Sequence, residues 1–190
     1  MRLAALVLML VPLQTQADPI DYAAVFAAHE VEVLAGDQID GRAIEILTLP
    51  DGIELRRLTG PNGEVTYTGI DASGRGAVGC LYNLFFELHA LARTCEWTPP
   101  KRAAKVLESR LRRITRFVMA NAVPPMEADT VNGYLAAQLD LWQAGPGREA
   151  CGAPDHGLQG FAAALSSDGF EQALDTALAV PRLPVTNPCL

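Results

Sequence analysis

The 190-residue sequence has too few basic residues to favour a nucleic-acid partner. It contains 15 Lys and Arg residues against 22 Asp and Glu, which gives a formal net charge of −7. Proteins that bind nucleic acids need a dominant positive field at the phosphate backbone. We therefore expect no DNA or RNA partner.

Long apolar runs are missing after the first residues of the chain. Beyond residue 17, no segment without charge reaches the roughly eighteen apolar residues that a membrane-spanning helix requires. We therefore expect no membrane span.

Two motifs of well-known active sites are also missing. The sequence has no G-x-S-x-G, the turn that carries the nucleophile of many serine hydrolases. A G-x-G-x-x-G does occur at 74–79, but no Lys-Ser or Lys-Thr follows it, so it is not a phosphate-binding loop. The helix after it leads to Thr98-Pro99-Pro100 and another helix, whereas a dinucleotide site needs a second parallel strand. We expect no cofactor.

The first 17 residues, MRLAALVLMLVPLQTQA, are typical of a secretory signal peptide. Arg2 precedes an apolar stretch from Leu3 to Leu13, and Ala17 is a small residue at the expected cleavage position. The stretch is too short to cross a bilayer. We expect removal of residues 1–17 and export of 18–190 as one domain, to a periplasm or to the outside of the cell.

The first part of that domain, residues 18–76, predicts a helix and a β-meander. Residues 18–29 have a helical pattern. Four turn dipeptides then recur every eleven residues: Asp40-Gly41, Asp51-Gly52, Asn62-Gly63 and Ser73-Gly74. Such pairs favour tight hairpins because they tolerate positive φ. The predicted antiparallel strands are 42–49, 53–59 and 64–70, with 31–35 as a candidate fourth.

The second part, residues 77–180, predicts four to five helices, followed by an irregular tail at 181–190. Residues 78–95 form an amphipathic pattern with His89 and Arg93 on its polar half. Further helices are predicted over 99–121, 130–143 and about 157–166, and a last one starts at Asp168, a capping-box residue, and stops before Pro181. The fold class is therefore α+β, with the helices packed on one face of the sheet.

Four cysteines in an exported chain predict two disulfides. Cys80 and Cys95 lie at opposite ends of one predicted helix, about 22 Å apart. A disulfide needs Cα atoms within about 7 Å, so these two should not pair. Two pairings remain, both of which tether the tail. We favour Cys80–Cys189 with Cys95–Cys151 over Cys80–Cys151 with Cys95–Cys189.

A thiol at a helix N-terminus could instead be a nucleophile, because the helix dipole lowers its pKa. Cys80 occupies that position, with His156 as the candidate base and His89 as the other choice. This alternative leaves an odd number of cysteines in an oxidising compartment.

The spacings from Cys151 to His156 and from His89 to Cys95 match no common zinc site, so we expect no metal.

Residues 101–116 hold seven basic residues and one acid. The candidate contact residues on this helix are Lys101, Arg102, Lys105, Arg112, Arg113 and Arg116. They could dock an anionic envelope component or a protein partner. We favour the simpler interpretation that nearby acids balance them, the candidates being Glu127, Asp129, Asp140, Glu171 and Asp175.

Together these features predict an exported, disulfide-stabilised soluble protein of the cell envelope that is a non-catalytic binding or structural module. The alternative is a cysteine-dependent hydrolase with Cys80 as nucleophile and His156 as base. The two differ in the state of the Cys80 sulfur.

Intact mass spectrometry of the secreted protein tests both export and disulfides. We expect a mass that begins at Asp18, no labelling by iodoacetamide under native conditions, and four labels after reduction and unfolding, one for each cysteine. A single native label on Cys80 would instead support the hydrolase.

Overall fold

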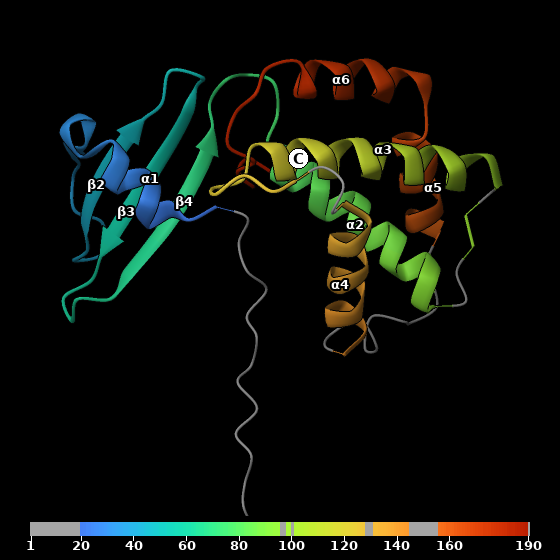
Figure 1. The fold of residues 1–190 in the computed structure, drawn as a ribbon, viewed down its shortest axis with the longest axis horizontal. Coiled ribbons are helices and arrows are strands. Elements are labelled where there is room, and N and C mark those ends of the chain that lie inside the picture. The colour runs from blue at the N-terminus through green and yellow to red at the C-terminus, as the bar shows by residue number, and fades with distance from the viewer. Residues whose placement is uncertain (1–19, 96–97, 100, 128–130, 145–155, 190) are drawn as a thin grey trace, which may run out of the picture.

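The computed structural model describes residues 20–95, 98–99, 101–127, 131–144 and 156–189 (Figure 1). The predicted signal peptide lies outside these ranges. In chain order the elements are α1 (Tyr22–Ala28), a 3-10 turn (Glu30–Glu32), β1 (Leu34–Ala35), β2 (Ala43–Thr48), β3 (Ile53–Thr59), β4 (Val65–Asp71), α2 (Val78–Thr94), α3 (Lys101–Ala120), α4 (Val131–Ala144), α5 (His156–Leu165) and α6 (Asp168–Leu178). This order confirms the predicted α+β fold.

The four strands form a simple antiparallel meander in the order β1-β2-β3-β4. At the turn between β1 and β2, Asp40 and Gly41 have φ values of 51° and 75°. This left-handed backbone explains why an Asp-Gly pair stands there. β1 is shorter than the predicted strand at 31–35, because the chain first makes the 3-10 turn at Glu30–Glu32.

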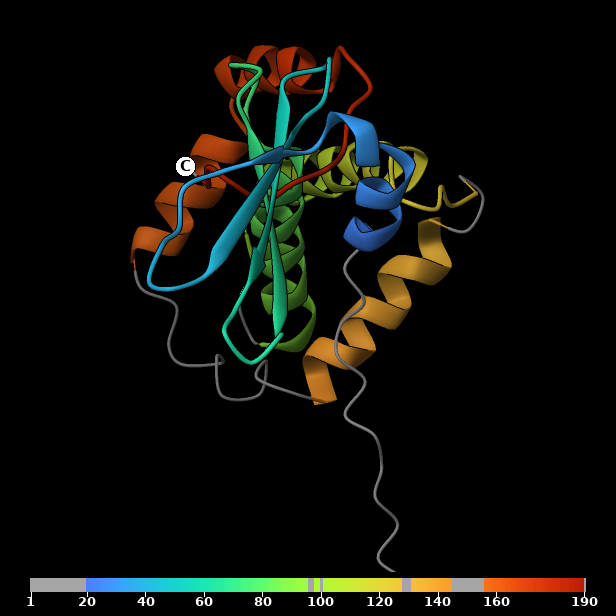
Figure 2. The same cartoon turned by 90° about the vertical axis from the view of Figure 1, so that its left-hand side faces the viewer.

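One face of the sheet has a core of its own. Leu47, Ile53 and Leu55 are fully buried against Phe26 of α1 and Val185 of the tail. Figure 2 shows α1 lying to one side of the strands. Tyr67 of β4 extends this contact, since its ring stacks on Tyr22 of α1 at 5.7 Å between centroids. Aromatic pairs at this distance add to the stability gained by burial.

Helices α2 to α6 bury a second core among themselves, centred on residues such as Phe85, Leu111, Ile114 and Leu174. They lie beside the sheet, beyond β4 (Figure 1). The expectation that the helices cover one sheet face is corrected here: α1 and the tail cover that face. Gly69 and Asp71 of β4 lie opposite Leu55 and Ile53 in the sheet, and these two residues give a helix little apolar surface to bury at this edge.

No helix in the described ranges has the length and apolar character that a bilayer span needs.

The N-cap of α6 is Ser167, whose hydroxyl accepts a hydrogen bond from the Phe170 amide. The prediction that Asp168 begins the capping box is therefore wrong by one residue.

The C-terminal tail lies between the sheet and the helices. The Asp71 amide donates to the Asn187 carbonyl at 2.7 Å, and the Gly79 amide donates to the Val185 carbonyl at 3.0 Å. A Cβ atom on Gly69 or Gly79 would collide with the tail at Val185 or Pro184. The last glycine of the G-x-G-x-x-G stretch therefore allows close approach of the tail.

Arg182 fixes the start of this tail through a buried ion pair. Its Nε donates to Asp71 Oδ2 at 2.7 Å, with the two side chains 0% and 1% exposed. Its Nη1 donates to the carbonyls of Ala177 and Val180, and its Nη2 donates to that of Gly76. One guanidinium thus joins β4, the glycine loop and the end of α6.

Replacing Arg182 should destabilise the whole protein. In R182M the Asp71 carboxylate stays buried without its partner, and we expect the free energy of unfolding to fall by about 3–5 kcal/mol. The matched control is R56M, because Arg56 pairs with Glu54 at a half-exposed site and its loss should remove less than about 1 kcal/mol. Urea unfolding measures both, and equal losses would contradict the role given to Arg182.

Candidate functional site

The structure decides the state of Cys80. Its sulfur is bonded to that of Cys189, with 5.2 Å between the Cα atoms, and the residue is 1% exposed. Cys80 therefore has no thiol in this structure, and the interpretation of it as a nucleophile is not supported. The disulfide spans 109 positions of the chain and tethers the tail to the first turn of α2.

Cys95, at the end of α2, is also disulfide-bonded. Its predicted partner, Cys151, lies outside the described residues, so that pairing stays a prediction. His156 is the first residue of α5, one position earlier than expected. Its side chain is outside the described part of the structure, so its role as a base also remains untested.

Part of the basic helix serves internal contacts. Arg110 is buried and donates to Glu171 and to the carbonyls of Leu165 and Ser167. Arg113 donates to Glu171 and to Asp175. Both hydrogen bonds of Arg113 raise its pKa. Glu171 and Asp175, which the sequence offered as balancing acids, therefore attach α6 to α3.

The other candidates on this helix divide into two groups. Arg112 donates to Glu108 one turn earlier and to Asn132 of α4, each at 2.9 Å. Lys101, Lys105 and Arg116 are exposed. The side chain of Arg102 lies outside the described part of the structure. The structure does not test docking through this helix, which stays a prediction.

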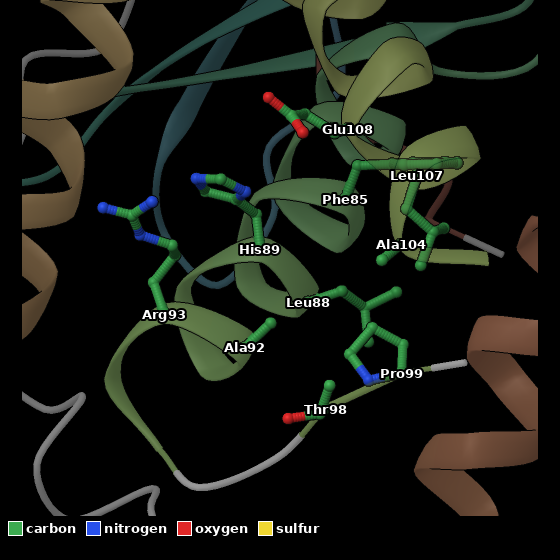
Figure 3. Close-up of a pocket in the computed structure, with 10 residues that line it drawn as sticks. All are labelled: Phe85, Leu88, His89, Ala92, Arg93, Thr98, Pro99, Ala104, Leu107 and Glu108. Atoms are coloured by element: carbon green, nitrogen blue, oxygen red, sulfur yellow. The ribbon is translucent and has the colours of Figure 1, made fainter. Parts of the chain in front are cut away.

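A groove between α2 and α3 is one of the concave sites in the described part of the chain. Its volume is about 270 Å³, and it is lined by Phe85, Leu88, His89, Ala92, Arg93, Thr98, Pro99, Ala104, Leu107 and Glu108. Figure 3 shows His89, Arg93 and Glu108 gathered on one side, and the apolar side chains of Leu88, Ala104 and Leu107 on the other. We call this site the α2–α3 groove.

A second hollow of about 190 Å³ adjoins the polar side of the groove. It shares His89, Arg93 and Glu108 with the groove, and it is also lined by Leu111, Arg112, Asn132, Leu135, Ala136 and Leu139. The three shared residues therefore separate an apolar cavity from a smaller hollow against α4.

His89 is the central polar residue of this site. Its imidazole is half-buried, and within the described part of the chain it makes no hydrogen bond or ion pair. Burial lowers its pKa below the ordinary value of 6.5, the positive charge of Arg93 lowers it further, and Glu108 acts in the opposite direction. The ring is therefore neutral at neutral pH, with both nitrogens available to a ligand.

No group of three or more His, Cys, Asp or Glu residues in the described ranges could hold a metal ion. The arrangement around His89 instead combines an apolar cavity, one imidazole and one guanidinium. It can bind, orient and exchange a proton with a small ligand.

The sequence placed His89 and Arg93 on the polar side of the helix and offered His89 only as the second choice of base for Cys80, while Arg93 was assigned to no site. Their spacing of four residues puts both on one helix face, which was the available signal. The groove forms because α3 crosses α2 beside this face. No local sequence pattern predicts how two helices cross.

Comparison of the chain with protein-family models, with curated proteins and with solved structures finds no match. The function is therefore inferred from the chemistry of the site itself.

The electrostatics of the groove can be measured by NMR titration of the His89 ring. We expect R93Q to raise the pKa of His89, because a repelling positive charge is removed, and E108Q to lower it, because an attracting carboxylate is lost. R116Q, on the same helix as Glu108, is the control and should leave the pKa of His89 unchanged. Shifts in the same direction for R93Q and E108Q would contradict this assignment.

Proposed function

We propose that this chain is an exported, disulfide-stabilised, non-catalytic binding module of the cell envelope, and that the α2–α3 groove is its ligand site. The single observation that carries the proposal is the groove itself. It combines an apolar wall with three polar side chains on one side. Sites for small molecules are usually concave and mostly apolar, with a few polar groups that fix the orientation of the ligand.

The walls of the groove are well supported by the core. Phe85, Leu88 and Leu107 are 1%, 3% and 8% exposed and belong to the core shared by α2 to α6. A cavity with such walls keeps its shape when it is empty, so a ligand loses little free energy to ordering of the protein. This favours a preformed site.

Export is supported by the sequence of residues 1–17 and is compatible with the Cys80–Cys189 disulfide, since such bonds persist in oxidising compartments. Lys101 and Lys105 lie on the first turns of α3, close in sequence to Ala104 of the groove, and both are exposed. Their positive charges raise the local concentration of anionic compounds near its mouth. The basic helix thus supports binding in this proposal.

Binding of N-phenyl-1-naphthylamine, an uncharged dye that fluoresces in apolar sites, tests the proposal. We expect saturable binding at one site per chain. A104W fills the groove and should weaken binding about tenfold or more, a change of about 1.4 kcal/mol or more. The matched control is A173W, at an exposed alanine of α6 that lines a different hollow, and it should bind the dye normally.

Circular dichroism melting of both variants shows whether they fold, and A92F, which fills the groove from α2, replaces A104W if that variant unfolds. Absence of saturable dye binding to the wild-type protein, or equal binding by the wild-type, A104W and A92F proteins, would overturn the proposal.

A further inference from the structure

We infer that the ligand of the α2–α3 groove is a free single-chain amphiphile with an anionic head group, whose head group contacts Arg93 and His89 while its chain occupies the apolar cavity. This inference rests on the function proposed above and adds the chemical class of the ligand. The juxtaposition that carries it is a guanidinium and an imidazole, neither with a partner among the described residues, at the edge of a cavity whose remaining lining is apolar apart from Thr98 and Glu108.

Arg93 is the cation best placed for the head group. It lies in the last turn of α2, and its side chain makes no hydrogen bond or ion pair among the residues that the structure describes. Arg112, which lines the adjoining hollow, is engaged with Glu108 and Asn132. A guanidinium that is free on an exposed edge can take a carboxylate, sulfonate or phosphate through two parallel hydrogen bonds.

Glu108 does not convert the site into one for cations. Its carboxylate accepts a hydrogen bond from Arg112, so its charge is offset within α3. The charged groups that face His89 are Arg93 from α2 and Glu108 and Arg112 from α3. The residues of α4 at the adjoining hollow, Asn132, Leu135, Ala136 and Leu139, carry no charge. Two positive charges against one negative charge favour an anion.

His89 makes this preference sensitive to pH. A neutral imidazole can donate one hydrogen bond to an anion, and an imidazolium adds a full positive charge. The pKa of His89 is held below 6.5, so the added charge comes only in mildly acidic conditions. An anionic ligand therefore binds more tightly as the pH falls through this range, and a neutral one does not.

Competition with the bound dye tests the inference, with two competitors that share one chain. Octyl sulfonate is anionic throughout the range used, and octyl methyl sulfone is its uncharged counterpart. We expect octyl sulfonate to compete about tenfold more strongly at about pH 7.5, equivalent to 1.4 kcal/mol, and the difference to grow at about pH 5.

Three variants assign this preference to residues. R93Q should bring the two competitors close together at about pH 7.5, and H89Q should keep most of the preference but remove its growth at about pH 5. R116Q removes a positive charge from the same helical unit, away from the groove lining, and should keep both effects. Dye binding without competitor is measured for each variant, so that competition is expressed relative to it, and R116Q, which lies outside the groove lining, should bind the dye like the wild-type protein.

The outcomes separate this inference from the function on which it rests. Equal competition by the sulfonate and the sulfone, or a preference unchanged in R93Q, would overturn the inference and leave the groove as a site for uncharged compounds. Absence of dye binding would overturn the proposed function as well. Binding to phosphatidylglycerol vesicles that an excess of octyl sulfonate does not reduce would place the ligand in a membrane surface and would also overturn the inference.

Discussion

The buried pair of Arg182 and Asp71 is the interaction on which the arrangement of the two cores depends. Two opposite charges without access to water are stable together only when hydrogen bonds satisfy the remaining polar atoms. Here the carbonyls of Gly76, Ala177 and Val180 accept from the guanidinium, and the Ser73 amide and hydroxyl donate to Asp71. These partners surround the ion pair only when β4, the glycine loop and α6 are in contact. The pair therefore favours this one arrangement of the three elements.

The tail that follows Arg182 extends this constraint in both directions. Val185 completes the core of the sheet, while Cys189 bonds to the first turn of α2. Sheet and helices bury largely separate sets of apolar residues, and the tail contacts both. A bond between residues 109 positions apart also restricts the unfolded chain, which adds to the stability of the connected state. The helices can thus present a groove of fixed shape although the sheet does not support it.

Local patterns predicted the elements well and their assembly poorly. Turn dipeptides such as Asp40-Gly41 located the hairpins because backbone conformation is a local property. A disulfide between Cys80 and Cys95 was excluded in the same way, because the length of a helix also follows from local backbone conformation. The division into two cores was missed, since it depends on Arg182 meeting Asp71 across 111 positions of the chain. The burial of Arg110 was missed as well, because its charge alone suggested an exposed helix face.

The same contrast explains why the candidate site does not contain Cys80 or the basic residues of α3 that the sequence offered as candidates. Cys80 and several of the cations of α3 are chemically conspicuous, and the structure uses them for a disulfide and for attachment of α6. His89 and Arg93 are single residues in an ordinary helical pattern, yet both lie beside a cavity and have no hydrogen-bond partner within the described ranges. The imidazole of His89 is half-buried and loses hydration without compensation from a described residue, while Arg93 is exposed beside it, and a bound ligand can contact both. Residues whose polar atoms the fold leaves unsatisfied are therefore better guides to binding here than residues of reactive type.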